Sequence, residues 1–271
     1  MNRRYKFYLV LLIVLSVFCI FSFENNASKL NIVGSSSVQP VMEQLIEKYE
    51  KNKSSVDINV QGGGSSLGIK CANLSVADIG MSSKDVECKY LQEFELGREA
   101  IVVIVNKNNP ISDISSADLQ KVYSGEITEW GEISNKSGKI NVIVREEGSG
   151  TLDSFKSVVM VKSEIKDDAL VQNSPGSVKQ MVINDENAIG FVSLCHLDNN
   201  LKNISIDGIA PCRSTVIGGE YKLQRSFLLL TNQNPDNQTK EFINWAMGDD
   251  SLDVLNSQKI FRVDCDDKKM F

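Results

Sequence analysis

The chain has 271 residues, of which 42% are hydrophobic, 24% are charged and one is a histidine. Its formal net charge is −6, which argues against a nucleic-acid partner because such proteins carry basic patches. A small anion is still an acceptable ligand, since local backbone dipoles can oppose the field of the whole molecule. One histidine and no Cys-x-x-Cys pair give little basis for a zinc site, and we expect no metal and no cofactor.

The N-terminus has the layout of an export signal. Three basic residues within the first six positions precede an almost unbroken apolar run over 7–23, as is typical of a secretory signal. The run is also close to the length of a membrane anchor. Cys19 is a candidate for lipidation, but the bulky Phe18 before it is a poor match to a lipidation signal. We therefore assign 1–28 to a signal peptide or an N-terminal membrane anchor and expect a periplasmic or membrane-anchored protein on the extracytoplasmic side.

Five cysteines follow this leader, and export permits disulfides among them. They are Cys71, Cys88, Cys195, Cys212 and Cys265. Their spacing suggests two short-loop bridges, 71 with 88 and 195 with 212, and leaves Cys265 over. Spacing alone does not prove this connectivity.

Two junctions rich in glycine and serine open the exported part. Residues 31–33 predict a strand, which leads through 34–40 (GSSSVQP) into a run with helical apolar spacing. Residues 56–60 alternate as a strand does and lead into 61–68 (QGGGSSLG), where a helix is expected to open around Leu67.

The next segments continue the alternation of strands and helices. Residues 77–85 predict a short strand that runs into a polar loop. The apolar run 100–105, ended by the breaker cluster 106–110, predicts a buried parallel strand that leaves a first lobe. Residues 116–125 predict a short helix that begins at a serine and ends at a glycine.

A third junction, 145–151 (REEGSGT), follows the buried strand predicted over 140–144 and precedes another helical pattern. A helix start leaves backbone N–H groups unpaired and carries partial positive charge, so it favours anions. Arg145 can donate a forked pair of hydrogen bonds to an oxyanion. The alternative is a capped helix with Arg145 paired to Glu146 or Glu147. Three such junctions in one chain indicate several helix starts that converge on one anion.

The remaining elements complete an α/β pattern. A helix is predicted near 179–183, a strand over 188–194, a buried strand over 227–230 and a helix over 239–247. The two apolar strands near 101–105 and 226–230 bracket the middle third of the chain. This arrangement is expected where a chain crosses twice between two lobes.

Four segments together support a resemblance to a known family: 34–40, 61–66, 77–83 and 145–151. On these segments the exported chain resembles the periplasmic phosphate-binding proteins of phosphate ABC transporters, the PstS family. The resemblance implies a type II periplasmic-binding-protein fold, a Venus flytrap of two α/β lobes with two crossover strands. We expect lobe 1 to comprise 29–104 plus 227–271, and lobe 2 to comprise 105–226.

The resemblance also implies the ligand and the partners. It predicts a non-enzymatic, monomeric binding protein that captures inorganic phosphate and delivers it to the membrane permease subunits of an ABC transporter. By position, the phosphate-binding residues are Ser37, Val38 (through its N–H), Ser65, Ser83, Arg145, Ser149, Gly150 (through its N–H) and Thr151. Glu147 stands where the family often has an acidic residue that grips the arginine, so we expect it to orient Arg145 from behind.

One position departs from the family. Many members have an aspartate at the end of the third loop, where it accepts the proton of phosphate, and this chain has Ser83. A hydroxyl can donate as well as accept. We therefore expect weaker discrimination against sulfate or arsenate and less sensitivity to the protonation state of phosphate.

Other interpretations come from different classes of protein. A nucleotide-binding loop near 63–70 lacks the required Gly-Lys-Ser/Thr order. A serine hydrolase would need His196 as its base, and no Gly-x-Ser-x-Gly elbow is present. A carrier of another tetrahedral oxyanion and a surface-anchored relative that does not transport are the closer alternatives. We expect Trp130 and Trp245 to pack in the interior, and we leave Arg225, a candidate hinge salt bridge, out of the site.

Overall fold

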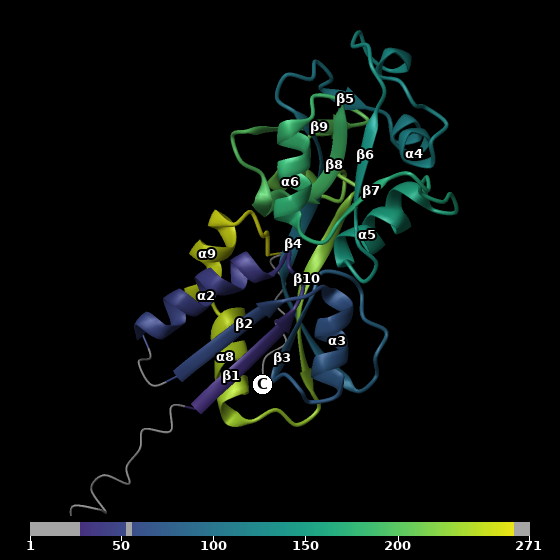
Figure 1. The fold of residues 1–271 in the computed structure, drawn as a ribbon. Helices are drawn as coiled ribbons and strands as arrows, with labels where there is room; N and C mark the ends of the chain where they lie inside the picture. Colours follow the sequence, from purple (N-terminus) through teal and green to yellow (C-terminus); the bar gives the residue numbers. More distant parts are fainter. Residues whose placement is uncertain (1–27, 53–55, 263–271) are drawn as a thin grey trace, which may run out of the picture.

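Two long strands run between the halves of the molecule in this computed structural model, which describes residues 28–52 and 56–262. They are β4 (Leu91–Asn106) and β10 (Gln224–Asn232), and they pair with each other in antiparallel orientation. Figure 1 shows one lobe toward each end of this pair. The sequence predicted crossover strands near 101–105 and 226–230, and these ranges lie within β4 and β10.

The first lobe is built on parallel strands. β1 (Ser28–Gly34) lies between β2 (Val56–Gly62) and β3 (Ile79–Ser82), and β10 joins β3 in antiparallel orientation. The helices of this lobe are α2 (Gln39–Asn52), α3 (Ser65–Asn73), α8 (Asn237–Met247) and α9 (Leu252–Ser257), with the short 3-10 helix η4 (Asp249–Ser251) between the last two.

The second lobe extends the sheet from the other end of β4. β8 (Ala188–Ser193) and β9 (Leu201–Ile206) pair with β4, while β6 (Asn141–Arg145) pairs with β8 and with β7 (Leu170–Gln172). The short β5 (Asp113–Ile114) pairs with β9. The helices are α4 (Ser116–Ser124), α5 (Gly150–Phe155), α6 (Pro175–Asn184) and α7 (Arg213–Ile217), with the one-turn helices η1 (Trp130–Glu132), η2 (Lys156–Met160) and η3 (Leu194–His196).

Helix boundaries follow local capping chemistry. The Ser115 side chain accepts a hydrogen bond from the Asp118 N–H at the start of α4, and Gly125 ends that helix in the left-handed conformation. Such caps satisfy backbone groups that the helix itself leaves unpaired. The serine start and glycine stop expected over 116–125 are therefore confirmed.

β4 contributes to two large apolar cores. Phe94 and Leu96 pack with the helices of the first lobe, whereas residues 100–105 pack in the second. Trp130 is fully buried in the second core and Trp245 packs against the first, as expected. The short segment between Leu96 and Ala100 is therefore where the strand passes from one lobe to the other.

The expected direction of the 100–105 strand is wrong. β4 is antiparallel to each of its partners, β8, β9 and β10. A continuous apolar run reports burial on both faces, which is typical of parallel strands. A central antiparallel strand covered on both faces is buried in the same way, so composition did not reveal its direction.

The suggested disulfides are also wrong, because Cys71, Cys88, Cys195 and Cys212 are free thiols. The Cys88 thiol donates to Asn73, while Cys195 lies beside Ser193 and Cys212 is exposed at the start of α7. Spacing measures separation along the chain and not in space. The predictions about the leader, Cys19 and Cys265 concern residues outside those that the structure describes. Among residues 28–52 and 56–262, every helix is too short or too polar to span a lipid bilayer.

Candidate functional site

The candidate site lies where strand ends from both lobes face each other. β1 ends at Gly34 and β2 at Gly62, each before a helix, while β3 ends at Ser82 and β6 at Arg145. Gly34 has φ +147°, and a Cβ added there would lie 2.2 Å from the Met81 carbonyl oxygen. Only glycine therefore allows the first loop to pack this closely against β3.

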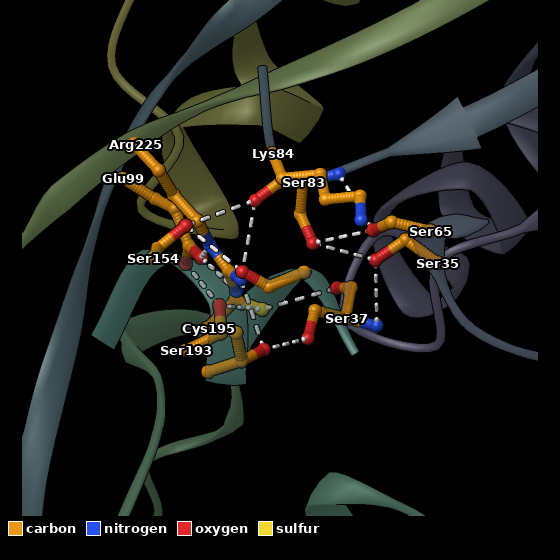
Figure 2. Close-up of polar contacts among 12 residues, drawn as sticks. Ser35, Ser37, Ser65, Ser83, Lys84, Glu99, Ser154, Ser193, Cys195 and Arg225 are labelled. Atoms are coloured by element: carbon orange, nitrogen blue, oxygen red, sulfur yellow. Dashed lines mark hydrogen bonds and ion pairs between the residues drawn. The ribbon is translucent and has the colours of Figure 1, made fainter. Parts of the chain in front are cut away.

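The first lobe contributes a buried cluster of serine hydroxyls (Figure 2). The Ser83 Oγ lies 2.9 Å from the Ser35 Oγ and 3.1 Å from the Ser65 Oγ. The Ser83 N–H also donates to the Ser65 Oγ at 3.0 Å. All three side chains are 2% exposed or less. Because each hydroxyl can donate or accept, the cluster offers both kinds of contact to a ligand.

The second lobe presents the start of α5 to this cluster. The Thr151 Oγ1 lies 3.0 Å from the Ser37 Oγ of the first lobe. A Cβ added at Gly150 would lie 2.4 Å from the Ser65 Oγ and 2.6 Å from the Ser83 Oγ. The junctions therefore converge in space: Ser37, Ser65, Ser83, Gly150 and Thr151 meet between the lobes, while the anion that they would share stays a prediction.

Two further predicted residues, Val38 and Ser149, lie at the same junctions and form hydrogen bonds within their own turns. The Val38 N–H donates to the Ser35 carbonyl oxygen at 3.1 Å, within the turn before α2. The Ser149 side chain caps α5 by accepting from the Leu152 N–H. Both residues are buried, so they shape the two loops that face each other.

Arg145 is 3% exposed and is held by its neighbour Glu146. Its Nε and Nη2 donate to the two carboxylate oxygens of Glu146, each at 2.9 Å, and Nη2 also donates to the Ser36 Oγ of the first lobe at 3.1 Å. The sequence left open whether Arg145 pairs with Glu146 or Glu147, and the structure shows Glu146 as its partner. The guanidinium still reaches across to the opposite lobe.

The expected role of Glu147 is wrong. Its side chain is 81% exposed and pairs with Lys156 at 2.8 Å. The Glu146 N–H bonds to the Gln172 carbonyl at the end of β7, so Glu146 continues the sheet beside Arg145. Glu147 already belongs to the turn before α5, which points its side chain into solvent.

Arg225, which the sequence suggested as a hinge salt bridge and not as a site residue, forms that salt bridge with Glu99 and also contacts the site. It lies on β10 opposite Glu99 on β4, and its Nη1 donates to the Thr151 Oγ1 at 2.9 Å. Burial raises the pKa of Glu99, an effect that the Arg225 charge opposes, and burial lowers the pKa of Arg225. The sequence did carry a signal for this pair: Glu99 and Arg225 are charged residues within the two crossover strands. Buried strands seldom carry charged residues unless these are paired.

His196 offers no support for a hydrolase. Burial, with the nearby cations Lys179, Arg225 and Arg145, lowers the pKa of His196 to about 4. Its Nε2 is buried and has no hydrogen-bond partner among the described residues. No serine hydroxyl is therefore hydrogen-bonded to His196 Nε2 in this part of the chain.

Comparisons with known proteins agree with this geometry. A family model described as a PBP superfamily domain matches residues 23–250. The phosphate-binding protein PstS of Bacillus subtilis (strain 168) is 28% identical over 234 residues, covering 84% of this chain and 78% of the relative.

Two solved structures extend the comparison. A putative phosphate ABC transporter substrate-binding protein with bound phosphate from Clostridium perfringens is 31% identical, with a TM-score of 0.84 over 87% of this chain and 100% of its own. An ABC-type phosphate transport receptor from Vibrio cholerae is also 31% identical, with a TM-score of 0.73 over 86% and 100% of the two chains. The type II two-lobed fold is thereby confirmed. The chain belongs to the PBP superfamily and, within it, to the PstS family of phosphate-binding proteins.

Proposed function

We propose that this protein captures inorganic phosphate between its lobes and delivers it to the permease of an ABC transporter on the extracytoplasmic side of a membrane. The observation that carries the proposal is the meeting of buried hydroxyls from both lobes at the start of α5, with Ser37 and Thr151 3.0 Å apart. The bound phosphate of the C. perfringens relative supports the ligand. We infer two lobes close to the expected 29–104 plus 227–271, and 105–226, with the boundary in β4 moved to 97–99 because residues 100–105 pack in the second core.

The proposed contacts combine both lobes. They come from the hydroxyls of Ser37, Ser65, Ser83, Ser149 and Thr151, the N–H groups of Val38 and Gly150, and the Arg145 guanidinium. Within the described chain, the hydrogen bonds of Arg145 use Nε and Nη2. We therefore propose that Nη1 faces the anion. Glu146, rather than Glu147, fixes the guanidinium plane.

Energetics explain why both lobes are needed. A hydrogen bond to a charged group contributes about 1.5–3 kcal/mol, and a helix terminus about 0.3–1 kcal/mol. Removing water from a phosphate dianion costs far more than any one of these contributions. Micromolar affinity needs about −8 kcal/mol in total. Many donors must therefore converge, and closure of the lobes is part of binding.

Ser83 keeps a second candidate ligand open. Its hydroxyl already contacts Ser35 and Ser65, and all three groups can turn a hydrogen toward an anion oxygen. An aspartate at this place would repel an anion that brings no proton. We therefore propose that sulfate competes with phosphate more effectively here than in relatives with an aspartate. Arsenate carries a proton as phosphate does, so Ser83 gives no reason to expect a change in its competition.

Isothermal titration of the exported protein with phosphate, sulfate and arsenate tests the proposal. We expect phosphate to bind most tightly, with sulfate displacing it when present in excess. Arg145→Ala should weaken phosphate binding by roughly 10- to 100-fold, the value of a hydrogen bond to a charged group, while the melting temperature changes little. Lys121→Ala, which removes an exposed cation on α4 of the same lobe, is the matched control and should bind as the wild type does.

Three results would contradict parts of this proposal. Absence of a heat of binding with all three anions would overturn oxyanion capture. Undiminished preference for phosphate in excess sulfate would overturn the role given to Ser83. A fall in thermal stability as large as the fall in affinity would make Arg145 a structural residue.

Non-enzymatic binding and delivery to a permease can be tested separately. We expect purified protein to show no turnover of phosphate esters or nucleotides. Reconstitution with the cognate permease should give phosphate uptake that depends on this protein. A surface-anchored relative without a transport role would bind phosphate and fail to support uptake.

A further inference from the structure

The hinge between the lobes contains a buried ion pair that the proposed binding set does not include. Arg225 of β10 and Glu99 of β4 are direct cross-strand partners. The Nε and Nη2 of Arg225 lie 2.7 Å and 2.6 Å from the Glu99 Oε1. Glu99 is 0% exposed and Arg225 is 7% exposed. The pair thus occupies the place where both strands pass from one lobe to the other.

The remaining guanidinium nitrogen of Arg225 reaches both lobes. Nη1 donates to the Thr151 Oγ1 of the second lobe at 2.9 Å and approaches the Ser83 carbonyl oxygen of the first lobe at 3.4 Å. Figure 2 shows Arg225 and Glu99 on one side of the Ser83 segment, with the Ser35 and Ser65 hydroxyls on the other. One side chain therefore links the hinge to the start of α5 in the second lobe and to the Ser83 loop of the first lobe.

A second series of contacts connects Glu99 with Ser37 of the site. Its Oε2 accepts a hydrogen bond from the Ser193 Oγ, which lies 3.0 Å from the Cys195 Sγ. The Cys195 thiol in turn approaches the Ser37 carbonyl oxygen at 3.8 Å. The side-chain hydroxyl of the same Ser37 contacts the Thr151 hydroxyl. The ion pair is thus connected to the Ser37–Thr151 contact from both sides.

Hydrogen-bond directions give this arrangement a consequence. Thr151 has one hydroxyl hydrogen, and Arg225 can only donate. Because Nη1 donates to the Thr151 oxygen, the Thr151 hydrogen points elsewhere, toward the Ser37 hydroxyl or an anion between the lobes. Arg225 thereby favours the state in which Thr151 donates to a ligand.

A purely structural role explains the pair less well. Buried ion pairs often add no stability over well-packed apolar residues, because desolvation offsets their attraction. A hinge needs no charge to hold two strands together. β10 already contains apolar residues, Phe227 and Leu229, that pack in the first core. The contact of Nη1 with Thr151 is the part of the geometry that a structural role leaves without a purpose.

We propose that Arg225 is a positioning residue of the anion site: held by Glu99 across the two crossover strands, it orients the Thr151 hydroxyl as a donor and ties that donor to the Ser83 loop as the lobes close. This role rests on the proposed function, since phosphate is the anion of that site.

A double-mutant cycle on phosphate affinity tests this role. We expect Arg225→Gln and Thr151→Val each to weaken binding by roughly 10- to 100-fold, the range for a charge-assisted hydrogen bond. Combined, they should bind within about threefold of Thr151→Val alone, because Arg225 then has no hydroxyl to orient. Arg98→Gln removes a neighbouring cation that is paired with Glu95 and is 44% exposed. It is the charge control and should change affinity less than threefold, as rough magnitudes for exposed charges suggest.

Arg225→Gln alone leaves the buried Glu99 carboxylate without its cation, and this variant can fail to fold. The cycle is therefore repeated with a second pair of substitutions. Arg225→Met combined with Glu99→Gln leaves no unpaired charge, and the cycle with Thr151→Val is repeated there. Additive losses in the background that folds would overturn the positioning role, whatever the change in melting temperature. Wild-type protein that binds no phosphate would overturn the proposed function and this role with it.

Discussion

His196 illustrates at the scale of one residue how the interlobe environment acts on a side chain. Burial is the largest influence that lowers the pKa of His196 to about 4, and the charges of Lys179, Arg225 and Arg145 act in the same direction, while a hydrogen bond with the Ser37 backbone opposes them. The ordinary pKa of histidine is about 6.5. Between these two values the unfolded chain binds more protons than the folded one, so stability falls as the pH falls.

This difference predicts acid sensitivity that depends on His196. Between pH 7 and pH 5 the wild type should lose up to about 2 kcal/mol of unfolding free energy through this residue. In the His196→Asn variant no imidazole can be protonated, so its unfolding free energy should fall by about 2 kcal/mol less than that of the wild type over this pH range. Urea denaturation of both proteins at the two pH values measures the effect. Equal losses in the two proteins would contradict the depressed pKa.

At the scale of one element, the start of α5 limits how closely the two lobes can approach. Gly150 is its first residue, and it lies against Ser65 and Ser83 of the opposite lobe. A Cβ at this position would meet the two hydroxyl oxygens at 2.4 Å and 2.6 Å. The helix itself would accept alanine readily, because alanine has a higher helix propensity than glycine. Closure and helix stability therefore respond to this substitution in opposite directions.

Gly150→Ala should consequently impair phosphate binding without unfolding the protein. Overpacking of this kind costs about 1–3 kcal/mol, so we expect a loss of roughly 10- to 100-fold in affinity. Small-angle scattering should show a smaller ligand-induced compaction than in the wild type. Gly176→Ala in α6 is the control, because the nearest atom to its added Cβ is the Ser174 Oγ at 3.8 Å. Wild-type affinity in Gly150→Ala would show that the two lobes do not approach this closely when phosphate is bound.

Contacts between the lobes also extend beyond the buried hydroxyls. Lys84 of the first lobe pairs with Asp153 of α5 at 2.5 Å, and its Nζ also donates to the Ser66 Oγ at 3.1 Å. The Ser66 N–H donates to the Gly148 carbonyl across the lobes at 3.3 Å. The Lys84 and Asp153 side chains are 25% and 32% exposed. Salt therefore screens this pair more than the buried pair at the hinge.

At the scale of the whole molecule, we expect the Lys84–Asp153 pair to make a small contribution to closure. An exposed ion pair contributes up to about 1 kcal/mol, so Lys84→Met should weaken phosphate binding by no more than roughly fivefold at low salt. The difference from the wild type should shrink as salt is added. Lys51→Met is the control, since Lys51 pairs with Glu47 within α2. A large loss that persists at high salt would mean that Lys84 contacts the anion itself.

The sequence by itself determined the local features of this protein. The capped start of α5, the α4 boundaries and the apolar crossover strands follow from neighbours along the chain, as capping and periodicity do. These local signals also placed the Gly/Ser junctions at strand ends. The resemblance that rests on the junctions then indicated the two-lobed fold and the ligand.

Only the tertiary structure decided which distant groups meet. The Arg225–Glu99 pair depends on strand register, and the choice of Glu146 over Glu147 depends on where β6 and β7 stop pairing. The direction of β4 and the free thiols likewise depend on spatial neighbours that are distant in the chain. Composition and spacing report burial and local conformation, whereas register and pairing are set by the packing of the complete chain.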